Sequence, residues 1–235
     1  MARVLAIGDP HEPVCRKGYL KFCKRIYREW GCNRVVIIGD IVDWHGISFH
    51  AKHPHAPGVT TEYELAKKGI QKWYKAFPKA QVCIGNHDAR VVRLAESVSI
   101  PEEFLREYTD LWDTPGWTWE REDFEIDDIY YMHGENFGGL HPSFNAARHM
   151  GESVVMGHVH STGGLKWLVS PKKRWFGMDT GCGIDDKQYA FAYGKHVKRR
   201  SVISCGVIIN GMPYHEMMPL EKYKSINTCT NNSVL

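Results

Sequence analysis

The sequence predicts an α/β fold in which helices pack against a parallel sheet. Three short apolar runs, each followed by Gly-Asp or Gly-Asn, alternate with two segments of helical periodicity. This β-α-β-α-β order makes neighbouring strands parallel, because each helical crossover returns the chain to the same end of the sheet. The chain has 235 residues, of which 43% are hydrophobic and 24% charged, so it is long and apolar enough to bury a full core.

The first half of the chain gives the clearest elements. Strands and helices are predicted, in chain order, at residues 4–7, 16–30, 35–38, 61–77 and 81–84. Gly31 marks the end of the first helix, and Thr61 with Glu64 has the spacing of a capping box at the start of the second. The second helix is expected to bury a single apolar face, made of Leu65, Ile70, Trp73, Tyr74 and Phe77.

The second half reads as one helix followed mostly by strands. A helix is predicted at 101–111, and strands at 129–133, 153–157, 164–169, 174–179, 189–193, 201–209 and 212–218. Asn210-Gly211 predicts a hairpin turn between the last two strands. The polar segment 221–235 is predicted to be a flexible tail, and residues 1–220 a single domain, because no linker or repeat interrupts them.

Composition excludes several classes of protein. No apolar run approaches the ~20 residues that span a bilayer, and the first residues lack the apolar core of a signal peptide. The seven cysteines form no C-x-x-C pair and are odd in number, which predicts reduced thiols in a cytoplasmic protein. The net charge of +3 is too small to indicate nucleic-acid binding by itself.

Each predicted strand of the first half, and two of the second, ends in residues that can bind metals. These clusters are Asp9-Pro10-His11, Asp40-Ile41-Val42-Asp43, Asn86-His87-Asp88, His133 and His158-Val159-His160. Ligands collect at the carboxyl ends of strands in open α/β sheets, so the clusters are expected to meet. In an extended chain, residues two apart point the same way. Asp9 with His11, and His158 with His160, can therefore each offer two ligands to one metal cluster. The preceding glycines are expected to let the chain turn sharply; they are Gly8, Gly39, Gly85 and Gly157.

Any one of these clusters could be structural. An isolated Asp-x-His or Asn-His-Asp is usually a turn, and Asp40 alone would be a helix cap. Their occurrence together, each at a predicted strand end, favours a shared functional site.

The full set of motifs resembles the calcineurin-like metallophosphoesterase family. The family pattern D-x-H, G-D-x-x-D, G-N-H-D/E, a lone His and G-H-x-H spans residues 5–160 of this chain. The resemblance implies a four-layer α-β-β-α sandwich of two facing mixed sheets, with the strands after residue 160 building much of the second sheet.

The resemblance also implies a site for two metal ions. Asp9, His11 and His160 would hold the first ion; Asn86, His133 and His158 would hold the second; and Asp40 would bridge them. Mixed imidazole and carboxylate ligands suit divalent transition metals, with Mn expected first and Fe, Zn, Co and Ni as alternatives. A hydroxide bridging the ions would attack the phosphoryl group of a phosphodiester.

The residues around the ligands receive roles from the same resemblance. His87 would stabilise developing charge on the phosphoryl group or protonate the leaving oxygen. Asp88 would orient His87, and Asp43 would accept a hydrogen bond from behind the ligands.

Departures from the protein Ser/Thr phosphatase branch point to the substrate. There the second motif continues with Arg-Gly and the third ends in Glu, whereas this chain has Trp44-His45 and Asp88. Without that arginine a phosphate monoester loses a bidentate clamp, so a diester is expected, with Trp44 and His45 contacting the substrate. Arg90, the arginine closest to the motifs, is a further candidate for substrate binding, although a helix starting there would turn it outward.

Two other regions are candidate substrate contacts. Residues 44–57 hold aromatic rings and four histidines and could stack a base, or could be a surface loop packed by its own rings. Basic clusters at 172–175 and at Lys195, Lys198, Arg199 and Arg200 could line a phosphate backbone, or could be solvated hairpin ends.

The sequence therefore leads to a phosphodiesterase acting on a nucleotide or nucleic-acid-type substrate. The alternatives are a nuclease on single-stranded or damaged DNA or RNA, a phosphomonoesterase, and a non-catalytic member that uses the fold to bind proteins. The last is disfavoured because every motif position is filled. No membrane partner is expected, and the sequence does not identify a protein partner.

Overall fold

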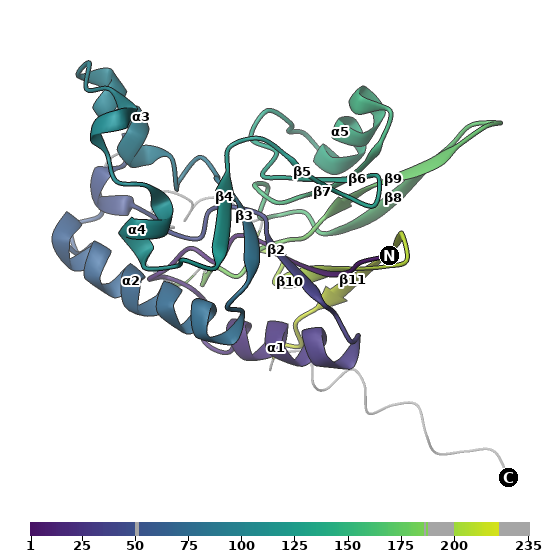
Figure 1. Cartoon of the computed structure of the whole chain (residues 1–235), viewed down its shortest axis with the longest axis horizontal. Helices are drawn as coiled ribbons and strands as arrows, with labels where there is room; N and C mark the ends of the chain where they lie inside the picture. The colour runs from purple at the N-terminus through teal and green to yellow at the C-terminus, as the bar shows by residue number, and fades with distance from the viewer. Residues whose placement is uncertain (50–51, 186, 188–199, 221–235) are drawn as a thin grey trace, which may run out of the picture.

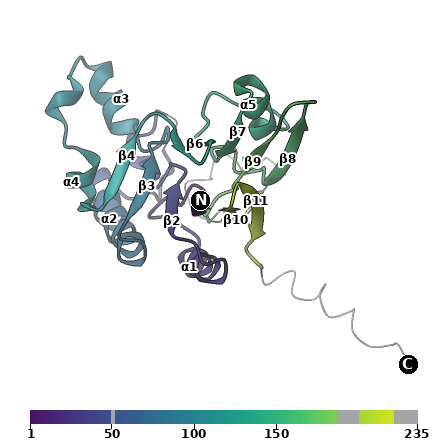
Figure 2. The same ribbon diagram turned by 45° about the vertical axis from the view of Figure 1, so that its right-hand side comes forward.

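The computed structural model describes residues 1–49, 52–185, 187 and 200–220. Eleven strands in these residues form two mixed sheets, one of six strands and one of five. Figures 1 and 2 show the two sheets stacked in the middle of the molecule, with helices on the outside.

The six-stranded sheet has the order β11-β10-β1-β2-β3-β4. Its strands, in chain order, are β1 (Arg3–Ile7), β2 (Arg34–Ile37), β3 (Ala80–Cys83), β4 (Trp117–Glu120), β10 (Ser204–Ile209) and β11 (Met212–Met217). The strands from β1 to β4 are parallel, whereas β10 and β11 are antiparallel additions at one edge. Asn210 and Gly211 join β10 to β11 with positive φ angles of 51° and 77°, which confirms the predicted hairpin turn.

The five-stranded sheet has the order β5-β6-β7-β9-β8. Its strands are β5 (Phe124–Ile126), β6 (Ile129–Met132), β7 (Ser153–Met156), β8 (Gly164–Val169) and β9 (Arg174–Asp179). The three central strands are parallel, and β5 and β8 are antiparallel edges. The β8–β9 hairpin reaches well beyond the rest of the molecule (Figure 1).

Five α-helices and two short 3₁₀ helices complete the described fold. They are α1 (Tyr19–Glu29), η1 (His45–Ile47), α2 (Val59–Ala76), α3 (Arg90–Ser97), η2 (Glu102–Phe104), α4 (Tyr108–Trp112) and α5 (Pro142–Met150). Along β1, Leu5 and Ile7 join the core beneath α1 and α2, while Val4 and Ala6 join the core between the two sheets. A third apolar cluster lies between α5 and the five-stranded sheet. These layers confirm the predicted α-β-β-α sandwich.

Several predicted elements need correction. The helix expected at 101–111 is two short pieces, η2 and α4, while α5, β4 and β5 were not predicted and α3 was anticipated only as a helix start at Arg90. The capping box at Thr61 is wrong, because α2 begins at Val59 and Gly58 caps it without a side chain. Leu65, assigned to the buried face of α2, is 42% exposed, and Ala66 takes its place in the core. The rest of the predicted face is correct, because Ile70, Trp73 and Phe77 are buried and Tyr74 is half-buried.

Two predicted segments cannot be compared with the structure. The strand at 189–193 and the tail 221–235 lie outside the described residues. Six of the cysteines are described, all as free thiols, and five of them are buried. Among the helices of the described residues, none combines the length and apolar character needed to cross a membrane.

Candidate metal centre

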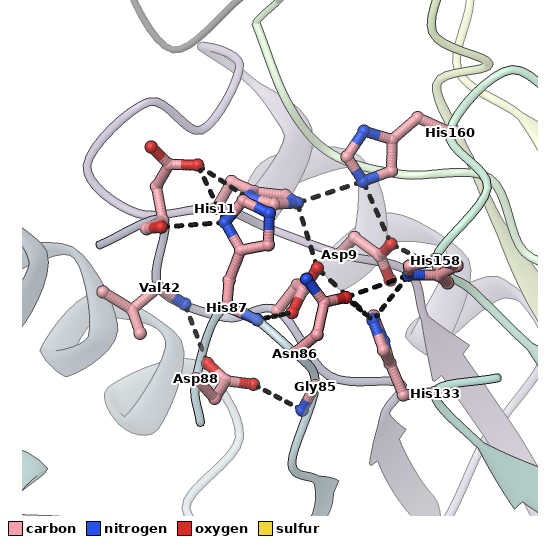
Figure 3. A network of polar contacts seen from close by, with 12 residues as sticks. Asp9, His11, Val42, Gly85, Asn86, His87, Asp88, His133, His158 and His160 are labelled. Carbon is pink, nitrogen blue, oxygen red and sulfur yellow. Dashed lines mark hydrogen bonds and ion pairs between the residues drawn. The ribbon is translucent and has the colours of Figure 1, made fainter. Parts of the chain in front are cut away.

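The polar clusters that follow the strands meet where the carboxyl ends of the parallel strands of both sheets come together. Asp9 and Asp40 lie just beyond β1 and β2, and Asn86 follows β3. His133 and His158 follow β6 and β7 of the second sheet. Figure 3 shows the labelled side chains of Asp9, Asn86, His133 and His158 pointing toward one another. All seven residues predicted as metal ligands are therefore brought together.

The first donor group consists of Asp9, His11, Asp40 and His160, with ligand atoms within 4.8 Å of one another. The Nε2 atoms of His11 and His160 are 3.0 Å apart, and His160 Nε2 is 3.2 Å from Asp9 Oδ2. Asp40 Oδ2 lies 3.7 Å from His11 Nε2. The group joins the first, second and fifth sequence motifs.

The second donor group consists of Asp40, His133 and His158. His133 Nε2 lies 3.3 Å from Asp40 Oδ2 and 3.2 Å from His158 Nδ1. Asn86 Oδ1 lies 3.0 Å from both of these ring nitrogens. Asp40 is thus common to the two groups, as a bridging ligand would be.

The donor set fits divalent cations. The Oδ1 atom of Asp9 is buried and, within the described part of the chain, has no hydrogen-bond partner. A buried carboxylate oxygen without a donor is costly unless a cation satisfies it. Donor atoms 3.0–3.7 Å apart can share an ion with bonds of about 2.0–2.2 Å. Imidazole mixed with carboxylate favours a transition metal over Mg or Ca.

Contacts behind the ligands hold their rings in place. His133 Nδ1 is 2.9 Å from the carbonyl oxygen of Ile38, so its Nε2 faces the centre. His11 Nδ1 is 3.1 Å from Asp43 Oδ1, which leaves Nε2 to the centre as well. Such partners fix the tautomer and direction of metal-binding imidazoles. Asp43 stands in the position behind the ligands that the sequence analysis assigned to it.

The charges of the cluster favour an ionised bridging carboxylate. Burial favours the neutral acid of Asp40, but the imidazoles around it, His133 foremost, outweigh burial and hold its pKa well below the usual range. Burial likewise opposes the charged form of His133, yet the Asp40 carboxylate raises its pKa to about 10. In His11 burial prevails and lowers the pKa. Asp40 is therefore available as an anionic ligand at neutral pH.

The backbone of the site is unusual at the ligands themselves. Asp9, His11, Asp40 and His158 have positive φ angles of 23°, 52°, 46° and 66°. Asp and His adopt this region more readily than most residues, but runs of such residues occur mainly at functional sites. The sharp turns that we assigned to the glycines are made by the ligands; of the four motif glycines, only Gly39 has a positive φ, at 98°.

Asp88 does not orient His87, contrary to the prediction. Its carboxylate accepts hydrogen bonds from the backbone N–H of Gly85 (2.9 Å) and Val42 (3.1 Å), so it ties the second and third motifs together. Burial, followed by the charge of Asp40, raises the pKa of Asp88 to about 7. The carboxylate beside His87 is that of Asp43, with Oδ1 3.3 Å from Nδ1.

The three predicted substrate contacts also differ from expectation. Trp44 is buried, with its ring stacked on Tyr63 at 6.3 Å, so it belongs to the core and is not a rim residue. His45 is buried too, and its Nε2 accepts a hydrogen bond from the backbone N–H of His53. Both are drawn inward because η1 begins at residue 45 and is packed against α2.

Arg90 points inward, although a helix start was expected to turn it outward. It is 8% exposed, and its guanidinium contacts the backbone of Asp43 and Trp44 and the ring of His87. The inward direction of Arg90 could have been predicted from its place at the start of a helix. Side chains on a helix lean toward its N-terminus, so the first residue of α3 leans back over the third motif.

The candidate substrate regions are only partly described. In segment 44–57, residues 50 and 51 lie outside the description; Phe49 is 59% exposed, and His55 is exposed. The basic residues 172–174 are exposed near the end of the β8–β9 hairpin. Of the second basic cluster, Arg200 is exposed and Lys195, Lys198 and Arg199 are not among the described residues.

Comparisons with known proteins agree with this architecture. Residues 2–179 match the model of a family described as calcineurin-like phosphoesterase. No curated protein matches the chain.

Similar solved structures include proteins of several kinds. Vacuolar Protein Sorting 29 from Cryptosporidium parvum is 13% identical, with a TM-score of 0.44 over 92% of this chain and 96% of that one. Yfce, a phosphoesterase from E. coli, is 14% identical, with a TM-score of 0.43 over 88% of each chain. The nuclease MPE of Pseudomonas putida is 15% identical, with a TM-score of 0.35 over 90% of this chain and 85% of that one.

Proposed function

The chain belongs to the calcineurin-like phosphoesterase family, and we propose that within this family it is a phosphodiesterase that depends on two divalent metal ions. Asp9, His11 and His160 would hold one ion, and Asn86, His133 and His158 the other, with Asp40 shared. Mn is the ion we expect, with Fe, Zn, Co and Ni as alternatives. When bound, such ions neutralise phosphoryl charge and acidify a coordinated water toward a pKa of about 7.

The observation that carries this proposal is the position of Asp40 between two donor groups. Its Oδ2 atom lies 3.7 Å from a nitrogen of the first group and 3.3 Å from one of the second. Its Oδ1 atom accepts a hydrogen bond of 2.8 Å from the backbone N–H of His87. The carboxylate is therefore fixed between the groups. Paired ions held this way favour displacement at phosphorus, because they act on the attacking and leaving oxygens together.

His87 is placed to act on the substrate. Its ring packs edge-on against that of His11 at 4.6 Å, next to the first donor group. Its Nδ1 is 2.8 Å from the carbonyl oxygen of Asp43, which fixes the ring. A histidine held beside the ions can stabilise charge on the phosphoryl group or protonate the leaving oxygen.

Charge favours a diester over a monoester. A monoester is mostly dianionic at neutral pH and calls for more positive charge around its terminal oxygens than a monoanionic diester. Among the described residues, Arg90 is the basic residue whose side chain contacts the metal-centre motifs, through the backbone of Asp43 and the ring of His87. Trp44 and His45 are buried and no longer support the preference. The proposed substrate is a nucleotide or nucleic-acid-type phosphodiester, with a phosphomonoester as the alternative.

The test is a panel of substrates on metal-reconstituted protein. We expect chelation to abolish hydrolysis, Mn to restore it, and kcat/KM to be higher for bis-p-nitrophenyl phosphate than for p-nitrophenyl phosphate. Asp40→Asn is expected to lose more activity and metal than any other single ligand change, with Asp110→Asn, an exposed aspartate, as the matched control. Only trace metal after Mn soaking would refute the metal site, and a consistent preference for the monoester would refute the diester.

A nuclease is the second candidate, favoured by the β8–β9 hairpin. Residues 161–178 contain four basic and no acidic residues. Trp167 on this hairpin is 39% exposed and has the Arg174 guanidinium 5.6 Å from its ring centre. Exposed aromatic and cationic side chains together are typical of surfaces that bind single-stranded nucleic acid.

A further inference from the structure

Arg90 is the first residue of α3, and its guanidinium is bound entirely within the site. Nη1 donates to the carbonyl oxygens of Asp43 (2.6 Å) and Trp44 (3.1 Å). Nη2 lies 3.1 Å from His87 Nε2. These contacts hold the planar group between the second and third motifs, next to the first donor group.

Among the described residues, the Arg90 guanidinium has no carboxylate in direct contact. Its three acceptors are two carbonyl oxygens and an imidazole nitrogen, all of which can be neutral. Within residues 1–49, 52–185, 187 and 200–220, no carboxylate forms an ion pair with it at 4.0 Å or less. Arginines with as little as 8% exposure are ordinarily paired with an anion, because desolvating the charge is costly. The buried Glu62 carboxylate acts on this charge only from beyond ion-pair distance, so the guanidinium can still take an anion in direct contact.

The contact with His87 also fixes the donor and acceptor roles of that ring. A guanidinium can only donate, so in the neutral form of His87 the Nε2 atom accepts from Arg90. The proton of the neutral ring then sits on Nδ1, which faces the carbonyl oxygen of Asp43 at 2.8 Å. In this arrangement the N–H groups at this edge of the site belong to Arg90, and His87 can protonate a leaving oxygen only after its ring is protonated and its contact with Arg90 breaks.

We propose that Arg90 binds the phosphoryl group of the substrate directly, so that α3 supplies the cation that the second motif lacks. Nη2 carries a second N–H besides the one directed at His87, and this N–H donates to a phosphoryl oxygen. The inference rests on the proposed function, because it concerns the substrate of the same site. A single guanidinium with its charge unpaired suits one monoanionic phosphodiester better than a dianion.

Binding of inorganic phosphate to the Mn-loaded protein, measured by titration calorimetry, tests the proposal without relying on turnover. We expect Arg90→Gln and Arg90→Ala to weaken phosphate binding by about 10- to 100-fold, the usual worth of a charge-assisted hydrogen bond. Arg90→Lys should recover part of the affinity, since lysine keeps the charge but not the planar fork. Arg93→Ala is the matched control, because Arg93 lies on the same helix, is exposed and contacts Phe49 instead.

Two further measurements separate binding from support of the fold. Metal content and melting temperature should stay near wild type in Arg90→Gln, and its KM for bis-p-nitrophenyl phosphate should rise by a similar factor to the phosphate dissociation constant. Wild-type phosphate affinity in Arg90→Gln would overturn the proposal. So would a wild-type protein that binds no phosphate, or loss of metal or folding in both Arg90→Gln and Arg90→Lys.

The outcomes distinguish this inference from the proposed function. Arg90-dependent phosphate binding in a protein that hydrolyses no phosphoester would refute the function and keep the inference. Diester hydrolysis by a protein whose phosphate affinity does not depend on Arg90 would support the proposed function and refute the inference about Arg90.

Discussion

At the scale of single residues, the site requires space as much as it requires ligands. A Cβ atom at Gly85 would lie 2.2 Å from Asp40 Oδ1 and 2.5 Å from its backbone nitrogen. A Cβ atom at Gly157 would lie 2.2 Å from Asp9 Oδ1. Neither glycine has a positive φ. Close approach to the two carboxylates, and not a turn, therefore requires glycine at both positions.

This requirement can be tested by adding one methyl group. Gly85→Ala is expected to push Asp40 out of place, lower the content of bound metal, and destabilise the fold by about 1–3 kcal/mol, as overpacking does. Metal content by elemental analysis and urea unfolding are the measurements. Gly138→Ala is the control, because a Cβ there meets nothing within 4 Å. Full metal content in Gly85→Ala would show that the loop can move aside.

His87 should be separable from the metal ligands. We expect His87→Asn to keep its metal and its melting temperature while turnover falls by about 10²–10⁴, the range for a positioned acid or charge stabiliser. The loss should be smaller for a p-nitrophenyl ester, whose leaving group needs no proton. His55→Asn, at an exposed histidine, is the control. Because the nitrogens of His11 and His87 also converge on Asp43, loss of metal would mean that His87 is a ligand.

At the scale of elements, α2 secures the loop that carries the second motif. Glu62 on α2 is fully buried and accepts hydrogen bonds of 2.7 Å from the backbone N–H groups of both His45 and Gly46. Its carboxylate thereby caps the first turn of η1, where both N–H groups would otherwise lack partners. The same loop carries Asp43 and the carbonyl oxygen of Trp44, so the cap supports the contacts of His87 and Arg90.

Glu62→Gln isolates this cap. An amide oxygen can accept from one N–H but the amide nitrogen cannot accept from the other, so a loss of about 1–3 kcal/mol in unfolding free energy is expected. Activity should fall with it, because the loop behind His87 loosens. Glu64→Gln on the exposed side of α2 should change stability by no more than about 0.5 kcal/mol. Equal stability of the two variants in urea unfolding would remove Glu62 from this role.

At the scale of the whole molecule, the site exists because two sheets end at the same place. The first three strands of one sheet and two central strands of the other direct their carboxyl ends to it. The β8–β9 hairpin starts close by, four residues after His160, and because Gly164 and Asp179 pair beside the end of β7, its turn lies at the opposite end of the sheet from the site. Its exposed Lys166, Lys172 and Arg174 offer a surface for a long anionic substrate that a small diester would not reach.

The hairpin therefore distinguishes a nuclease from an enzyme of small diesters. Replacing Lys166, Lys172 and Arg174 by glutamine should weaken single-stranded DNA binding. The slope of log K against log salt concentration should become shallower by about 0.7 for each phosphate that the protein no longer neutralises. Hydrolysis of bis-p-nitrophenyl phosphate should not change. The control replaces three exposed lysines on α1 and α2, which are Lys21, Lys24 and Lys68. DNA binding that is equal in both variants would argue against this surface.

The sequence by itself determined the alternating elements and the residues that gather at their ends. Strand positions from β1 to β3 are correct to within a residue or so, because apolar runs ending in glycine and a polar residue leave few alternatives. The seven predicted ligands meet because the carboxyl ends of parallel strands share one edge of a sheet. The short α5, β4 and β5 were not predicted, since few of their residues carry a periodic signal.

Only the tertiary structure decided the roles of the residues around the ligands. Trp44 and His45 are polar or amphipathic enough for a surface loop, yet packing against α2 buries them. Asp88 is next to His87 in the sequence and was predicted to orient it, but the path of the backbone gives that contact to Asp43. Arg90 faces the site because the helix starts at that residue. Spacing fixes which residues arrive at a sheet edge, whereas side-chain direction depends on neighbours far along the chain.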